Sequence, residues 1–132
     1  MEELFDEIIE EAKPKKSKPK LLVIVDADPR TNPRAAEAVR MAGGVSVWRQ
    51  VEISVVLRDA AARALGAGTG ELIDGKIFGQ FVPMVRESGG QVYLMPNAGA
   101  MEVVDTGELL GNVLKEPDFV ALTAKFDYVM RF

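Results

Sequence analysis

The stretch LLVIVDADPRTNPRAAEAV, residues 21–39, decides the fold. Leu21 to Val25 form a continuous apolar run, which is typical of a strand buried on both faces of a parallel sheet. The run leads into a polar loop, and Asn32 and Pro33 then supply an N-cap and a first helical position. Small apolar residues recur behind them at helical spacing. The stretch therefore predicts the first strand–helix unit of an α/β domain.

The rest of the chain repeats this alternation of strands and helices. Residues 51–57 alternate apolar and polar positions as a strand does, and a short alanine-rich helix is expected over 60–65. Residues 76–88 carry an apolar helical stripe, and Pro83 is expected to kink or split that helix. Gly89 and Gly90 end the helix and are followed by a strand, while Gly43 and Gly44 are expected to pack closely on the sheet. Further expected elements are a short turn at 108–110, a minimal strand at 112–114, a helix at 118–126 and a closing strand at 128–132.

This order of elements implies one domain with a particular architecture. Strands separated by helices at this spacing form a parallel sheet whose helices cover both faces. We therefore expect a three-layer α/β/α sandwich with a mainly parallel sheet of about five strands. In such sheets the functional site lies beyond the carboxyl ends of the strands.

The amino-acid composition excludes several kinds of chemistry for this chain. It contains no cysteine, so disulfides, thiolate catalysis, persulfide chemistry and cysteine-type zinc sites are excluded. It also contains no histidine, the commonest general base and the commonest metal ligand. We therefore expect no catalytic residue, no metal site and no cofactor, and a protein that is less suited than most to be an enzyme by itself.

Charge and hydropathy bear on the compartment and the partners. The net charge of −4 argues against nucleic acid as a partner, because binding to the phosphate backbone relies on basic residues. The longest uncharged apolar run, at 21–25, is far shorter than a membrane span, so no membrane partner is expected. The N-terminus is acidic where a signal peptide would be basic, and we expect a cytoplasmic protein.

The first twenty residues differ from the rest and are expected to form a separate segment. Residues 1–12 carry six acids, together with an apolar helical stripe formed by Leu4, Phe5, Ile8, Ile9 and Ala12. Residues 13–20, KPKKSKPK, read as an extended and solvated linker. The segment is either a loosely tethered helix or an arm whose apolar stripe docks on a neighbouring subunit.

Polar residues near the expected strand ends are candidates for ligand binding. The candidates are Asp28, Asn32, Arg34, Arg58 and Asn97, with Asp26 beside them. Arg34 at the start of a helix is placed to pair with an anionic group. Each residue also has a plain structural alternative. Asp28 and Asn32 fit turn and cap chemistry, Asn97 fits a turn, and the arginines fit ion pairs with Asp28 or Asp59.

Four stretches resemble the DsrE/DsrF-like family of small sulfur-relay proteins, which includes the TusD-type sulfur carriers. They are DPRTNPRAAEAVRMAGG after the first strand, VEISVVLRDAAARAL, LIDGKIFGQFVPMVRESGGQVYLMPNAGAM and the closing FVALTAKFDYVMRF. Together they cover residues 21–132 in order. The resemblance implies a domain over 21–132 that assembles into trimers or hexamers, with a persulfide-carrying cysteine after the third strand in some members.

The resemblance places Met95 at the position of the family cysteine, with Ala98 or Ala100 as the alternatives. A thioether has no proton to lose and no exchangeable sulfur, so persulfide transfer by this chain is excluded. The expected function is therefore a non-catalytic binding or scaffolding subunit, working as a homo-oligomer or with a cysteine-bearing sulfur-relay partner. The alternative is a protein or enzyme that binds a small anionic ligand through the strand-end residues. A flavodoxin-like domain remains a further alternative, although the first loop lacks the Ser/Thr-rich phosphate site.

Apolar residues outside the expected core support assembly into an oligomer. Met101, Val103 and Val104 follow the loop after the third strand, and the N-terminal stripe adds to them. This is more apolar surface than one small domain is expected to expose. We therefore expect a trimer or a hexamer.

Overall fold

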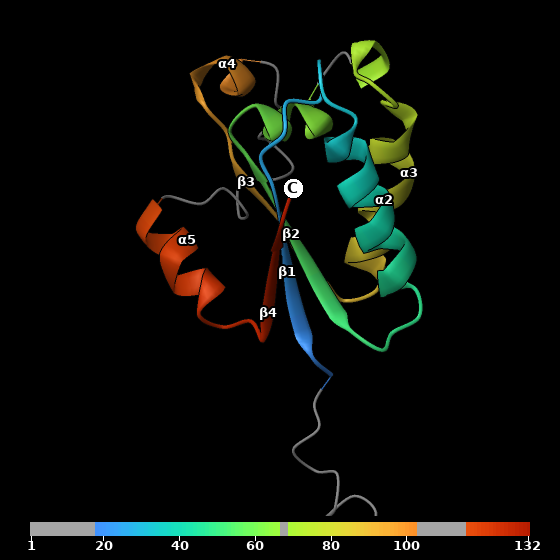
Figure 1. Cartoon of the computed structure of the whole chain (residues 1–132), viewed down its shortest axis with the longest axis vertical. Coiled ribbons are helices and arrows are strands. Elements are labelled where there is room, and N and C mark those ends of the chain that lie inside the picture. Colours follow the sequence, from blue (N-terminus) through green and yellow to red (C-terminus); the bar gives the residue numbers. More distant parts are fainter. Residues whose placement is uncertain (1–17, 67–68, 103–115) are drawn as a thin grey trace, which may run out of the picture.

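The fold is built on a parallel sheet of four strands. The structure is a computed structural model that describes residues 18–66, 69–102 and 116–132. The strands are β1 (Lys20–Val25), β2 (Glu52–Arg58), β3 (Val92–Met95) and β4 (Tyr128–Arg131). All three neighbouring pairs are parallel, in the spatial order β3-β2-β1-β4 (Figure 1). The α/β class is confirmed, with four strands in place of about five, and the strand expected at 112–114 lies outside the described residues.

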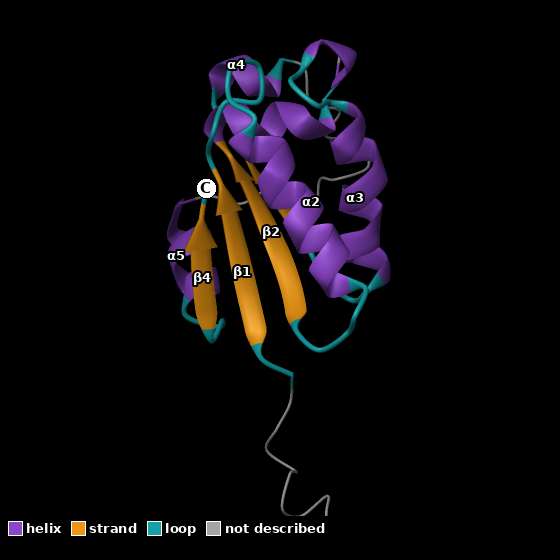
Figure 2. Cartoon of the chain, turned by 45° about the vertical axis from the view of Figure 1, so that its right-hand side comes forward, coloured by secondary structure: helices purple, strands orange, loops and turns teal. Residues whose placement is uncertain are grey.

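Helices cover both faces of this sheet and make three layers. The helices α2 (Arg34–Ser46) and α3 (Lys76–Glu87) lie side by side on one face, and α5 (Glu116–Thr123) lies on the other (Figure 2). Short turns of 3₁₀ helix, η1 (Asp59–Leu65) and η2 (Thr69–Glu71), and the short helix α4 (Ala98–Met101) complete the described part. The three-layer α/β/α sandwich that the sequence predicts is therefore confirmed.

The strand order explains which face each helix covers. From β1 to β2 to β3 the chain moves in one direction across the sheet, so right-handed crossovers put α2 and α3 on the same face. From β3 the chain returns past two strands to β4, and the same handedness puts α5 on the opposite face. The loops after β2 and β3 thus lead to opposite faces, which makes the carboxyl ends of these two strands the switch point of the sheet.

Alternation along β1 divides the core into two clusters. Val23 and Val25 face α2 and α3 and belong to the larger cluster, which contains most of the buried side chains. Leu22 and Ile24 face α5 and form a smaller cluster that includes Phe119. The continuous apolar run of the first strand is therefore buried on both faces, as the sequence predicts.

Two glycines allow close approaches that a side chain would block. A Cβ atom on Gly43 would lie 2.7 Å from the carbonyl oxygen of Phe81, so α2 meets α3 there. The sequence predicted close packing of this glycine on the sheet, whereas the contact is made between the two helices. Gly89, which follows the C-cap residue Ser88 of α3, has φ = 94°, the left-handed conformation that ends many helices.

Several element boundaries differ from those that the sequence predicts. The segment after β2 is a 3₁₀ helix, Asp59–Leu65, and α3 runs without interruption from Lys76 to Glu87 although it contains Pro83. The last helix begins at Glu116 and ends at Thr123, earlier than the expected 118–126. The expected turn at 108–110 lies outside the described residues.

The beginning of the sheet coincides with the end of the lysine- and proline-rich stretch. β1 begins at Lys20, and the backbone N–H of Lys20 donates a hydrogen bond of 2.8 Å to the Asp127 carboxylate just before β4. The expected N-terminal helix lies outside the described residues. In the part of the chain that the structure describes, no helix is long and apolar enough to cross a membrane.

Candidate functional site

The carboxyl ends of the strands carry the polar side chains that the sequence singles out. Because the strands are parallel, the loops after β1, β2 and β3 emerge at the same edge of the sheet. The structure does bring the candidate residues to this edge. Their individual contacts decide whether they act together.

Asp26 holds the edge strand β4 in place. Its carboxylate accepts a hydrogen bond of 2.8 Å from Nε of Arg131 and forms an ion pair of 2.6 Å with the same guanidinium. The backbone N–H of Asp26 also donates to the carbonyl of Phe132. The side chain and the backbone of Asp26 therefore both hold the last strand against β1.

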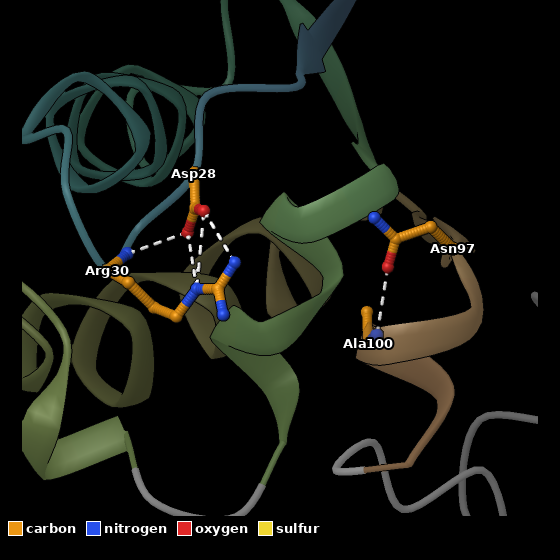
Figure 3. A network of polar contacts seen from close by, with 4 residues as sticks. All are labelled: Asp28, Arg30, Asn97 and Ala100. Carbon is orange, nitrogen blue, oxygen red and sulfur yellow. Dashed lines mark hydrogen bonds and ion pairs between the residues drawn. The ribbon is translucent and has the colours of Figure 1, made fainter.

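Asp28 pairs with Arg30, two residues further along the loop. Both carboxylate oxygens accept hydrogen bonds from the Arg30 guanidinium, at 2.8 to 3.2 Å, and one also accepts the Arg30 backbone N–H (Figure 3). The side-chain hydrogen bonds from Arg30 are the main cause that lowers the pKa of Asp28, and the charge of Arg63 contributes a little. Asp28 is therefore an ionised partner in a bidentate pair, which favours a structural role over general-base catalysis.

Asn32 and Arg34 serve the start of α2. The Asn32 side-chain oxygen accepts a hydrogen bond of 2.9 Å from the backbone N–H of Arg34. This satisfies one of the free backbone donors at the helix start. The predicted positions are wrong by one residue, because Pro33 is the N-cap and α2 begins at Arg34, so Asn32 bonds the helix from one position before the cap. The Arg34 side chain is exposed, and Asp28 takes Arg30 as its partner.

Arg58 turns toward the face of the sheet that α5 covers. Its guanidinium carbon lies 4.9 Å from the centre of the Phe119 ring, a cation–π contact between the end of β2 and α5. The loop after β1, with Asp28 and Arg30, leads instead to α2 on the opposite face. The structure therefore separates Arg58 from the Asp28–Arg30 pair.

The loop after β3 is used to start the short helix α4. The Asn97 side chain accepts a hydrogen bond of 2.9 Å from the backbone N–H of Ala100, which is N-cap geometry (Figure 3). Figure 3 draws no contact between this cap and the Asp28–Arg30 pair. Asn97 thus has a local structural role, as the N-cap of α4 and not as the turn residue that the sequence offered as its alternative.

Met95 lies inside the smaller core cluster. The side chain is 9% exposed and packs with Leu22, Ile24, Val56 and Phe119. Ala98 is exposed at the start of α4, whereas Ala100 is fully buried. The three positions that the resemblance compares with the family cysteine therefore range from buried to open.

Arg63 is a residue of the segment after β2 that the sequence did not single out. It lies on η1, and its Nε is buried without a hydrogen-bond partner among the described residues. A Cβ atom on Gly99 would lie 3.1 Å from a terminal nitrogen of Arg63, so glycine lets α4 approach the guanidinium. Sequence alone gives little signal for Arg63, because it is one arginine within an alanine-rich stretch.

The arrangement offers binding chemistry and little catalytic chemistry. Within the described ranges, no group of three or more acidic side chains is placed to hold a metal ion. The carboxylates of Asp26 and Asp28 are both committed to arginines at short distances. The same edge also carries the exposed side chains of Arg34 and Asp59 and the half-buried guanidinium of Arg63.

Comparison with known proteins adds no assignment to this geometry. No family model matches the chain, and no curated protein matches it.

Proposed function

We propose that this protein is a non-catalytic binding or scaffolding subunit related to the DsrE/DsrF-like sulfur-relay proteins, working in the cytoplasm as a homo-oligomer. The observation that carries the proposal is the environment of Met95. This residue stands where the resemblance places the family cysteine, and its thioether is packed into an apolar cluster. A buried thioether supports packing and cannot carry a persulfide.

The contacts of the neighbouring polar groups also support binding in preference to catalysis. A general base or nucleophile needs a side chain that is free to reach a substrate. Asp26 fastens β4, Asp28 is held by Arg30, and Asn97 caps α4. The polar side chains of the loops after β1 and β3 therefore stabilise the local structure of the domain.

A sulfur-loading experiment tests the non-catalytic part of the proposal. The protein is incubated with a cysteine desulfurase and a sulfur donor, and its intact mass is measured. We expect no gain of a sulfur atom. The Ala98→Cys variant is the positive control, because this position is exposed and a thiol there is accessible. Stable sulfur on the unmodified chain would contradict the proposal.

A binding experiment tests the scaffolding part. The protein is mixed with a purified, cysteine-bearing DsrE/DsrF-like protein and studied by sedimentation velocity. We expect a complex of defined stoichiometry that carries both chains. If the two proteins sediment independently at micromolar concentrations, a sulfur-relay partner of this kind is ruled out.

A second candidate function is the binding of a small anionic ligand at the strand ends. The observation in its favour is Arg63, a half-buried cation whose Nε has no partner among residues 18–66, 69–102 and 116–132. Arginine pairs well with carboxylates and phosphates. A thermal-shift screen of inorganic phosphate, nucleotides, CoA esters and small carboxylates tests this function. A hit that is lost in Arg63→Met or Arg34→Ala and kept in Arg49→Met supports it, and silence across the panel contradicts it.

A further inference from the structure

An apolar hollow opens at the amino end of β1 and β4. Its volume is about 390 Å³, and almost all of its wall is formed by apolar side chains. The residues that line it are Pro19, Leu21, Val51, Tyr128, Val129 and Met130.

The hollow lies on the same face of the sheet as α2 and α3, beside the area that these helices cover. In the register of the sheet, Tyr128 pairs with Leu21 and Met130 pairs with Val23, so both side chains point to that face. Figure 2 shows α2 standing over β1 and β2, with β4 open beside it. Tyr128 is 65% exposed and Met130 is 43% exposed.

Covering an open apolar face of this kind with another apolar surface would be favourable. Sheets of parallel strands are normally buried on both faces, because apolar surface removed from water stabilises the folded state. Here no described helix covers β4 on this face, and all four residues of the strand are exposed. An exposed, contiguous apolar surface marks a site of interaction.

The N-terminal segment of the same chain joins the described structure beside this hollow. Pro19 is one of the lining residues, and the residues that precede it in the sequence are the linker 13–18 and the acidic segment 2–12. A linker of six residues spans at most about 20 Å when extended. A helix of eleven residues is about 16 Å long, and a four-residue strand such as β4 is about 13 Å long. The segment therefore has the reach and the length to lie along β4.

The sequence of the segment matches the chemistry of the hollow. In a helix over 2–12, Leu4, Phe5, Ile8 and Ile9 share one face, and the acids occupy the other. The residues beside the lining positions include the cations Lys20 and Arg49, which suit an acidic partner. Two acids also lie beside the lining positions: Asp127, which accepts a hydrogen bond from the backbone of Lys20, and Glu52, which is the register partner of Lys20 in the sheet. The apolar face of the segment is therefore the main match to the hollow.

We propose that residues 2–12 dock as an amphipathic helix, in the same chain, with the Leu4/Phe5/Ile8/Ile9 face in the hollow between β1 and β4. The same chain is favoured over a second copy because the tether ends on the hollow itself. A short tether holds its segment at an effective concentration in the millimolar range, far above that of a second molecule in dilute solution.

The absence of native cysteine makes disulfide mapping a direct test. The variant Ile8→Cys/Met130→Cys places one thiol on the proposed docking face and one in the hollow, where Met130 is partly exposed. The matched control is Glu10→Cys/Met130→Cys, because position 10 lies on the opposite side of the helix at nearly the same tether length. Both are equilibrated in glutathione buffers at low micromolar protein and read by intact mass and non-reducing electrophoresis.

If the segment docks, both variants form the disulfide within one chain. The effective concentration of the two thiols is then expected to be at least about tenfold higher in the Ile8 variant than in the control. Equal effective concentrations in the two variants would show a loosely tethered segment and overturn the proposal. A disulfide that forms between chains in place of within one chain would assign the hollow to a neighbouring copy and would also overturn it.

Hydrogen exchange on the full chain gives a second measurement without cysteine chemistry. Ile8→Asp is expected to raise the exchange rate of β4 amides several-fold, because a charge on the docking face releases the segment. Glu10→Asp is the matched control and is expected to leave these rates unchanged. Identical exchange in β4 for the two variants would contradict docking at this strand.

Discussion

At the scale of single residues, the packing of this domain depends on the absence of a side chain at Gly90. This buried glycine lies between the end of α3 and β3, where its backbone N–H donates to the carbonyl of Val85. A Cβ atom built there would lie 1.8 Å from the carbonyl oxygen of Ile53, closer than any real contact. The main chain of β2 therefore requires glycine at this position, two residues before β3.

Gly90→Ala tests this requirement against a matched glycine in the same region. We expect a loss of at least about 2 kcal/mol in the free energy of unfolding, since backbone must move to admit the methyl group. Gly79→Ala in α3 is the control. Its Cβ would meet nothing within 4 Å, and the gain in helix propensity is expected to stabilise by about 0.5–1 kcal/mol. Urea denaturation measures both, and similar values for the two variants would refute the packing account.

Asp28 gives a prediction for the dependence of stability on pH. Hydrogen bonds from Arg30 lower the pKa of Asp28 in the folded protein below its value in the unfolded chain. The stabilisation from this pair is therefore complete above the unfolded pKa, about pH 4, and is lost as the pH falls through the lower folded pKa. We expect Arg30→Gln to raise the pKa of Asp28 in a carboxyl-carbon NMR titration and to flatten this acid loss.

Arg34→Gln is the control for this titration, because Arg34 belongs to the same loop–helix region and does not bond Asp28. It is expected to leave the pKa of Asp28 almost unchanged. A larger effect from Arg34→Gln than from Arg30→Gln would mean that the pairing at this loop is wrong.

At the scale of secondary-structure elements, α5 packs on the sheet through the buried ring of Phe119 and the partly buried Leu122. Phe119 is buried in the smaller core cluster, where it packs with Leu22, Ile24, Val56 and Met95. The same ring lies under the Arg58 guanidinium. One aromatic side chain thus joins the last helix to three strands.

Phe119→Ala is expected to destabilise the fold by about 3 kcal/mol, because it removes a large apolar group and leaves a cavity. Val120→Ala, the next residue in the same helix, is the control. It is 61% exposed and should change stability by less than about 0.5 kcal/mol. Thermal or urea unfolding measures both. A small loss in Phe119→Ala would show that α5 is held by other contacts.

At the scale of the whole molecule, apolar side chains remain exposed outside the hollow. Trp48 is 76% exposed after the end of α2, and Val47, Met101 and Val120 are also open to solvent. Positions 103 and 104, which the sequence grouped with Met101, lie outside the described residues. Exposed apolar surface of this kind is consistent with assembly.

We expect a trimer or hexamer by light scattering at micromolar protein, with Trp48→Ser shifting the distribution toward smaller species. The single tryptophan also reports its own burial through fluorescence. Dilution should move the emission to longer wavelength if Trp48 becomes exposed as copies separate. A single monomeric species at every concentration would contradict the homo-oligomer.

Local patterns predicted most of the fold. Three local signals were enough for this: the apolar run at 21–25, the helical stripes of α2 and α3, and the glycine at 89 that ends α3. Each depends only on residues close together in the sequence, so it can be read without knowing the tertiary contacts. The absence of cysteine and histidine determined which chemistry this chain lacks. The polar side chains were correctly placed near strand ends, because parallel strands all end at one edge.

Only the tertiary structure decided which side chains meet. Asp28 forms its ion pair with Arg30 and not with Arg34. Arg58 contacts the ring of Phe119, which belongs to a helix far along the chain. Gly43 packs against Phe81 of the neighbouring helix and not against the sheet. These contacts depend on the strand order and on which face each crossover takes, and no local periodicity records either. The hollow beside β4 has the same origin: the sequence made this strand apolar, but its position at the edge of the sheet leaves the strand uncovered.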